Sequence, residues 1–458
     1  MELIYTHTKN AVSVRFIEGS LSRFTGTELF VGAGEAKHLS VRKTILLMRK
    51  VVSLAKQNRI AALAIDWVHL RSVVSDQVSD AALGELSATA FYMADYEHIT
   101  YKHPPKDGFS FVETVAILSA TKEGKAGVER GQIIAGEVNA CRELANTPGG
   151  DMTPKTLSQA AKKALQGTKA TYTALGRAEM AKLGMGAILG IAKGSAHEPQ
   201  FIVMEYWGAS KKDKPIVLVG KGVTFDTGGL NIKTGDNMYE MHLDMSGGAA
   251  VIHTLALVAK LKLKVNVVGL VPAVENNLGG DAVRPGDILR SLSGKTIEIL
   301  NTDAEGRVVL ADGITYAKKY DPKVVVDVAT LTGASLVALG TQASAFMTND
   351  EAMIMPIMSL AEKSGDYLWP FPAWEEYEAM TKGTFGDIPN ISTDGNSRYG
   401  GVIAGGMFLK AFAKELECLW IHVDMAPRMT ATSGEHLAKG AVGAPIRFLL
   451  TLIENGVE

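Results

Sequence analysis

The first part of the chain alternates short apolar runs with stretches in which apolar residues recur at helical spacing. The apolar runs predict strands, and the helically spaced stretches predict helices. Strands are predicted at residues 29–34, 61–66 and 114–120, and helices at 38–57 and 80–96. This alternation predicts a compact α/β domain over residues 1–127.

A charged stretch punctuated by glycine, KEGKAGVERG at residues 122–131, predicts the boundary of this domain. A helical pattern over residues 132–146 follows and ends at the breaker TPGGDMTP. We interpret this helix as the connection at the start of a second domain, which spans residues 128–458.

The second domain continues the alternation of strand and helix patterns. Several of its apolar runs, such as IVLVG and VVVDVATL, are rich in valine and lack polar alternation, as expected of strands buried on both faces. We therefore predict a central, mainly parallel but mixed sheet flanked by helices. Helices are predicted at 156–165, from Gly247 and from Val308, and strands at 201–207, 215–220, 265–274, 296–300, 324–331 and 419–426.

Composition narrows the possible functions. The 47 basic and 49 acidic residues give a net charge of −2, so no overall field attracts nucleic acid or anionic lipid. Two cysteines exclude a cysteine-based zinc cluster, so a metal would bind oxygen or nitrogen. The sequence lacks a secretory pattern at its start and a run of about 20 apolar residues, which predicts a soluble cytoplasmic protein with no membrane partner.

Polar residues collect in loops that follow predicted strands, where ligands bind in open α/β sheets. Asp226, Asp244, Asp303 and Glu305 lie in such loops with few compensating charges nearby in sequence. Four bare carboxylates in an α/β interior need positive charge. Carboxylate ligands favour Mn²⁺, Mg²⁺ or Zn²⁺, and four of them suit a site with two metal ions better than a site with one.

Each residue also has a purely structural interpretation. Asp244 could cap the helix that follows it, and Asp303 with Glu305 could stabilise the start of the next helix. Lys221 and Lys233 could be solvated, while Arg307 could form a surface ion pair. The residues expected to be satisfied groups of the core are Asp327, His242 and His253.

The order and spacing of these motifs resemble the leucyl aminopeptidase family, the cytosol aminopeptidases. The resemblance is carried by VGKGVTFDTGGLNIK (219–233), MHLDMSGGAAV, NTDAEGRVVLADGI (301–314) and DVATLTGA, and NTDAEGR is the family's signature. The resemblance extends, with fewer matching residues, from about Arg142 to Leu450. Residues 1–120 only occupy the place of the family's variable N-terminal domain.

The resemblance implies a centre with two divalent cations, Mn²⁺ or Zn²⁺ and also Mg²⁺ or Co²⁺. One cation would be held by Asp226, Asp303 and Glu305. The other would be held by Lys221, Asp226, Asp244 and Glu305. Lysine ligates only as the free amine, so the cations must depress the pKa of Lys221 far below its usual value of about 10.4.

The resemblance further implies two catalytic residues. Lys233, kept as an ammonium, would stabilise the oxyanion formed when water attacks the first peptide carbonyl. Arg307 would bind a bicarbonate ion that moves the proton from the attacking water to the leaving amine. The sequence itself shows at Arg307 only a guanidinium suited to an anion.

The expected activity is removal of N-terminal residues from peptides that have a free amino end. The family's side-chain pocket maps to residues that make an apolar, adaptable cavity favouring Leu or Met: Met241, Thr330, Gly333, Ala426 and Met429. The resemblance also implies a homohexamer.

Two other functions account for part of the sequence. A dinuclear phosphoesterase also uses carboxylates, but such sites usually include histidines, and His242 is the only histidine in the motif loops. A regulatory protein that binds nucleic acid through its N-terminal domain is disfavoured by the near-neutral charge.

Overall fold

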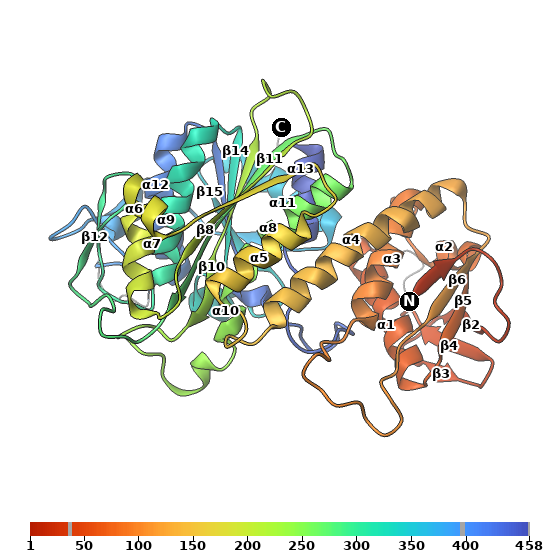
Figure 1. Ribbon diagram of the computed structural model, residues 1–458. Coiled ribbons are helices and arrows are strands. Elements are labelled where there is room, and N and C mark those ends of the chain that lie inside the picture. Colours follow the sequence, from red (N-terminus) through yellow and green to blue (C-terminus); the bar gives the residue numbers. More distant parts are fainter. Residues whose placement is uncertain (35–38, 394–398, 457–458) are drawn as a thin grey trace. The chain divides into compact units, whose positions relative to one another are not determined.

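The computed structural model describes residues 1–34, 39–393 and 399–456. The chain forms two compact units (Figure 1). Unit 1 comprises Met1–Asn139 with Ala431–Gly440, and unit 2 comprises Ala140–Thr430 with Ala441–Glu458. Both units are α/β, as the sequence predicts.

Unit 1 contains a six-stranded sheet in the order β1-β6-β5-β2-β4-β3. All neighbouring strands are parallel except β3, which runs antiparallel to β4. Helices α1 and α3 pack against each other. The strands are β1 (Glu2–Ile4), β2 (Val12–Ile17), β3 (Arg23–Phe24), β4 (Glu28–Gly32), β5 (Ala62–Asp66) and β6 (Thr114–Leu118), and the helices are α1 (Val41–Gln57), α2 (Trp67–Val73) and α3 (Asp80–Asp95).

The stretch at 122–131, interpreted above as a domain boundary, is helical. It forms the first part of α4, one 25-residue helix over Lys122–Asn146. Its glycines allow close packing on α3: a Cβ at Gly127 would lie 2.0 Å from the carbonyl oxygen of Ala81, and one at Gly131 2.5 Å from that of Glu85. Their helical spacing puts these glycines on one face, so they permit a close approach and do not break the helix.

Unit 2 contains a nine-stranded sheet in the order β16-β15-β18-β14-β9-β11-β8-β7, with β10 beside β11. The central strands β18, β14, β9 and β11 are parallel, and antiparallel pairs flank them. The sheet is therefore mixed, with a parallel centre, as predicted. Its strands are β7 (Thr171–Leu175), β8 (Gln200–Trp207), β9 (Ile216–Gly220), β10 (Gly222–Asp226), β11 (Asn266–Asn276), β14 (Val324–Ala329), β15 (Ser344–Thr348), β16 (Leu368–Pro370) and β18 (Leu419–Asp424).

Helices cover both faces of this sheet (Figure 1). On one face α9 packs with α7 and α12, and on the other α8 packs with α5 and α13. A small separate sheet joins β12 (Ile288–Arg290), β13 (Thr296–Glu298) and β17 (Ile388–Pro389). The helices are α5 (Pro154–Ala164), α6 (Arg177–Leu183), α7 (Gly186–Ile191), α8 (Ser246–Lys260), α9 (Glu305–Ala317), α10 (Gly333–Leu339), α11 (Ile354–Ser364), α12 (Gly401–Ala413) and α13 (Ile446–Asn455).

The valine-rich strands β9 and β14 are buried along their whole length, and α8 is buried from Ser246 to Ala259. Helix α9 begins at Glu305, three residues before the predicted start at Val308. In the described part of the chain, no helix combines the length and apolar character needed to cross a membrane.

Candidate metal centre and substrate pocket

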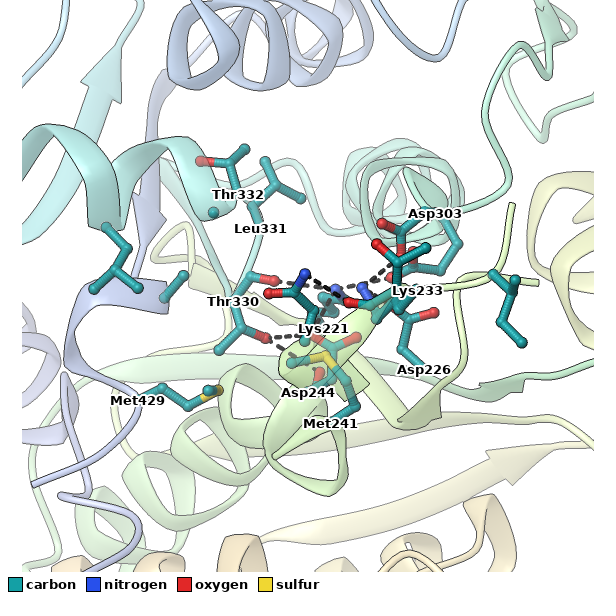
Figure 2. A pocket seen from close by; sticks show the side chains of 17 residues that line it. Lys221, Asp226, Lys233, Met241, Asp244, Asp303, Thr330, Leu331, Thr332 and Met429 are labelled. Carbon is teal, nitrogen blue, oxygen red and sulfur yellow. Dashed lines mark hydrogen bonds and ion pairs between the residues drawn. The ribbon is translucent and has the colours of Figure 1, made fainter. Parts of the chain in front are cut away.

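Four acidic side chains and two lysines converge where strands of the unit 2 sheet end (Figure 2). Lys221 lies between β9 and β10, and Asp226 is the last residue of β10. Asp244 belongs to the short helix η3 (Met241–Met245), which directly precedes α8. Because parallel strands end at one edge of the sheet, these separate motifs meet at one point.

Lys221 is held on several sides. Its Nζ lies 2.8 Å from Asp244 Oδ1 and 2.9 Å from Glu305 Oε1, and it donates to the carbonyl oxygen of Thr330 at 3.0 Å. Only 3% of the residue is exposed. The amine is therefore fixed in direct contact with two of the predicted metal ligands.

Lys233 makes a second set of ion pairs. Its Nζ lies 2.8 Å from Asp226 Oδ2 and 2.5 Å from Asp303 Oδ1. The two lysines thus stand among the carboxylates, where Figure 2 shows them between Asp226, Asp244 and Asp303.

The cluster is short of positive charge. Four carboxylates face two ammonium groups, which leaves two negative charges uncompensated in a buried site. Ligand atoms of Asp226, Asp244 and Glu305 lie within 4.8 Å of one another. Among the described residues, buried Asp244 Oδ2 has no hydrogen-bond partner. An orphaned carboxylate oxygen in an acidic cluster fits divalent cations.

The pKa values follow from this crowding. Burial lowers the pKa of Lys221, but Asp244, Glu305 and Asp226 outweigh it and raise the pKa above its usual value. Burial and the neighbouring Asp226 raise the pKa of Asp303 to about 6, against the opposing effect of Lys233. Without cations Lys221 is therefore an ammonium, so it could ligate a metal only after losing its proton to the charge of that metal.

Asn276 at the end of β11 supports the cluster, although the sequence analysis did not identify it. Its side-chain amide donates to Asp226 Oδ1 at 2.7 Å and to the carbonyl oxygen of Thr302 at 3.0 Å. The backbone N–H of Gly228 also donates to Asp226 Oδ1, at 2.9 Å. Asp226 therefore turns its other oxygen, Oδ2, toward Lys233 and the centre of the cluster.

A cavity of about 440 Å³ contains the cluster. All five predicted metal ligands, Lys233 and all five predicted substrate-pocket residues line it. Met241 and Met429 lie on the side of the cluster away from Asp303 (Figure 2). Thr330, predicted to contact substrate, also donates its hydroxyl to Asp244 Oδ1 at 2.7 Å. The lining residues that the sequence analysis did not name are Ile232, Thr234, Asn237, Leu331, Thr332 and Leu336.

Arg307, in the first turn of α9, is not among the residues lining this cavity. It is 7% exposed and donates through Nη1 to the carbonyl oxygen of Asn390 at 3.0 Å. Its Nε finds no partner within the described residues. Burial lowers its pKa to about 10, despite the opposing charges of Glu305 and Asp424. A buried guanidinium with a spare donor suits a small anion.

The interpretation of Asp244 as the cap of α8 is wrong, whereas Glu305 does lie in the first turn of α9, where a carboxylate stabilises the start of a helix. No side chain caps α8 or α9, whose N-cap positions are Met245 and Ala304. Neither Asp244 nor Asp303 therefore serves as a helix cap.

Asp327 is a hydrogen-bonded core carboxylate, as expected. It accepts from Trp420 Nε1 at 2.7 Å and pairs with His422 Nδ1 at 2.5 Å. Of the histidines predicted in the core, His253 is buried and His242 is half-buried.

Fold and site together define an α/β protein whose strand-end loops form a centre of lysines and carboxylates that could bind metal. Residues 139–450 match the catalytic domain of the cytosol aminopeptidase family. The chain belongs to this family.

Individual relatives agree with this assignment. A probable cytosol aminopeptidase of Azoarcus sp. (strain BH72) is 46% identical over 327 residues, which are 71% of this chain and 64% of that protein. One from Saccharophagus degradans is 40% identical over 437 residues, 93% of this chain and 85% of that protein. The chain thus spans less than two thirds of the Azoarcus relative and most of the Saccharophagus one.

A solved structure, the bottromycin maturation enzyme BotP in complex with Mn, is similar over 98% of this chain and 100% of its own. The TM-score is 0.87 and the sequence identity is 27%.

Proposed function

We propose that the protein is a metal-dependent aminopeptidase that removes apolar residues, preferentially Leu or Met, from peptides with a free N-terminus. The observation that carries this proposal is the cluster of four carboxylates and two lysines, which lines one cavity and has fewer positive than negative charges. Family membership supports the same activity.

In this proposal two divalent cations, Mn²⁺ or Zn²⁺ and alternatively Mg²⁺ or Co²⁺, supply Lewis acidity and acidify water near neutral pH. Asp226, Asp303 and Glu305 hold one cation. Lys221 and Asp244 would hold the other cation together with Asp226 and Glu305. The manganese named with BotP supports this choice of metal.

Lys233 and Arg307 then act on the substrate and its protons. The ammonium of Lys233 stabilises negative charge on the carbonyl oxygen of the scissile bond, because its burial in a low dielectric strengthens that interaction. Arg307 would hold bicarbonate through its spare donor, and the anion would supply a group that accepts and donates a proton beside the leaving amine.

Substrate choice follows from the cavity. Met241 and Met429 offer flexible apolar surface, while Gly333 and Ala426 leave room for a side chain. Discrimination between apolar residues that differ by a methylene is worth only about 1 to 3 kcal/mol, so specificity is broad. The free α-amino group of the substrate occupies a coordination position that an acylated end cannot fill.

The proposed assembly is a homohexamer in the cytoplasm, which is what the resemblance to the cytosol aminopeptidases implies. Residues 1–127 are proposed as the N-terminal domain and 128–458 as the catalytic domain. A phosphoesterase is the weaker candidate, because no histidine lines the cavity among the described residues.

The test is a panel of aminoacyl anilides, assayed after chelation and again after metal is returned. Leucyl and methionyl anilides should be hydrolysed only with metal present, and faster than glutamyl or lysyl anilides. N-acetyl-leucyl anilide should not be cleaved. Efficient cleavage of the acetylated substrate would refute amine coordination, and hydrolysis of a phosphate ester in place of the anilides would favour the phosphoesterase.

A further inference from the structure

Unit 1 contains a cavity of its own, about 290 Å³ in volume. It lies where the neighbouring parallel strands β2 and β4 end, since Ser20 follows β2 and Gly32 is the last residue of β4. Helix α1 and the segment around His436 complete its walls. The carboxyl end of parallel strands is the usual ligand position in an open α/β sheet, and the volume is close to that of small-molecule pockets.

The cavity carries positive charge without an acidic counterpart. Lys43, Lys50 and His436 line it, and no acidic side chain does so among the residues of the lining that are described. Lys50 Nζ donates to the carbonyl oxygens of Ser20 at 3.3 Å and Gly32 at 3.0 Å. An ammonium has three donors, so one remains.

Lys43 is exposed and forms no ion pair with any residue in the described ranges. Nearby Glu435 lies 3.9 Å from the guanidinium of Arg49 and does not line the cavity.

Burial and neighbouring charges disfavour further positive charge in this cavity. Burial lowers the pKa of His436, and Lys50 and Arg49 lower it further. Burial also lowers the pKa of Lys50. Helix α1 adds to the same field: its first turn contains no acidic residue, although the positive end of a helix dipole favours acids there. A bound anion would relieve all of these costs.

The remaining wall is apolar. Leu39 and Leu47 are buried, and Leu46 is half-buried beside them. A ligand that fills the cavity would therefore place an anionic group by the lysines and an apolar or aromatic body on the leucines.

From this geometry we infer that unit 1 binds a small phosphate-bearing molecule with an apolar body, whose phosphate lies between Lys43, Lys50 and His436. Two lysine ammonium groups, beside a histidine ring that can donate a hydrogen bond, match the charge of a phosphate dianion better than that of a single carboxylate. The site shares no residue with the proposed catalytic centre, so the two proposals stand or fall separately.

Phenyl phosphate is the direct probe, titrated into the full-length, metal-chelated protein by calorimetry at 0.15 M salt, about physiological ionic strength. Inorganic phosphate and benzoate are the comparison ligands. Phenyl phosphate should bind at least about fivefold more tightly than either, because only it offers both phosphate and an aromatic ring.

Lys43→Gln is the test variant, since this exposed residue can lose its charge without disturbing the core. It should weaken phenyl phosphate binding about tenfold, whereas Arg42→Gln, which removes a charge from the same turn outside the cavity, should change it less than about twofold. Leucyl anilide hydrolysis should be unchanged in both.

Three results would overturn the inference. One is the absence of phenyl phosphate binding up to about 10 mM. Another is binding that Lys43→Gln leaves unaltered, which would place the anion elsewhere, for example at Arg307. The third is tighter binding of benzoate than of phenyl phosphate.

Discussion

Replacing Gly306 by alanine tests the role of Lys221 without removing any predicted ligand. Gly306 is the second residue of α9, and a Cβ there would lie 2.7 Å from Lys221 Nζ and 2.6 Å from its Cε. Non-bonded carbon contacts are favourable at about 3.5 to 4.0 Å, so the end of the lysine side chain must retreat by roughly 1 Å.

The amine has no equivalent position to move to. It is buried and already contacts Asp244, Glu305 and the carbonyl oxygen of Thr330 at 2.8 to 3.0 Å. Metal ligation tolerates about 0.2 Å, and a displacement of 1 Å in a catalytic site costs on the order of 100-fold. We therefore expect kcat/KM on leucyl anilide to fall about 100-fold in Gly306→Ala.

The stability of Gly306→Ala toward urea should fall much less than its kcat/KM. Alanine favours a helix over glycine by up to about 1 kcal/mol, which offsets part of the steric strain. Gly136→Ala is the matched control, because this exposed glycine lies within α4 and a Cβ there meets nothing within 4 Å. The assay pairs anilide kinetics with urea unfolding. A Gly306→Ala protein that keeps kcat/KM within about twofold of wild type would refute the assigned role of Lys221.

Three further predictions concern unit 2. Lys221→Arg and Asp303→Asn should each abolish Mn²⁺-dependent hydrolysis of leucyl substrates with an unchanged circular dichroism spectrum, because arginine cannot ligate as a free base; retention of most of the turnover would refute the ligand assignment. Asn276→Ala should weaken metal binding about 10- to 100-fold in a chelator competition, since it removes the side-chain donor to Asp226 Oδ1 and leaves only the backbone N–H of Gly228; unchanged affinity would contradict this. Burial lowers the pKa of His422, but its carboxylate partner Asp327 outweighs this effect, and the pKa is raised overall. The native state therefore retains the proton to higher pH than the unfolded state. The resulting stabilisation is complete below about pH 6.5 and is lost as pH rises through the folded-state value, so the unfolding free energy of wild type should decline with pH more steeply than that of His422→Gln; parallel profiles would count against it.

The sequence predicted the alternating α/β pattern because buried parallel strands produce long apolar runs that stand out along the chain. Strand β14, for example, is six residues without an exposed position. Shorter elements such as β1 and α2 escaped notice, since three to seven residues give too little periodicity. The glycines in the first part of α4 were misinterpreted because their close packing on α3 depends on a partner that is distant in sequence.

The candidate ligands were identifiable because each lies in a short polar motif near the end of a strand or the start of a helix. Asn276 and Asn390 were not, because their action depends on tertiary contacts. Asn390 accepts hydrogen bonds from the backbone N–H groups of Leu300 and Asn301 at 2.8 and 3.2 Å, and so fixes the loop before Asp303 from about 90 residues away. A lone asparagine in a turn-rich stretch gives no local signal of such a contact.

The central claim is that two metal ions bind at the cluster and are needed together for hydrolysis. The direct measurement is the rate of leucyl anilide hydrolysis as Mn²⁺ is returned to the chelated protein, with bound metal counted per chain by elemental analysis. We predict no turnover without metal and full turnover only as bound Mn²⁺ approaches two per chain, with no rise in Asp303→Asn. Full activity in the chelated protein, or a maximum reached with one ion per chain, would contradict the two-metal account.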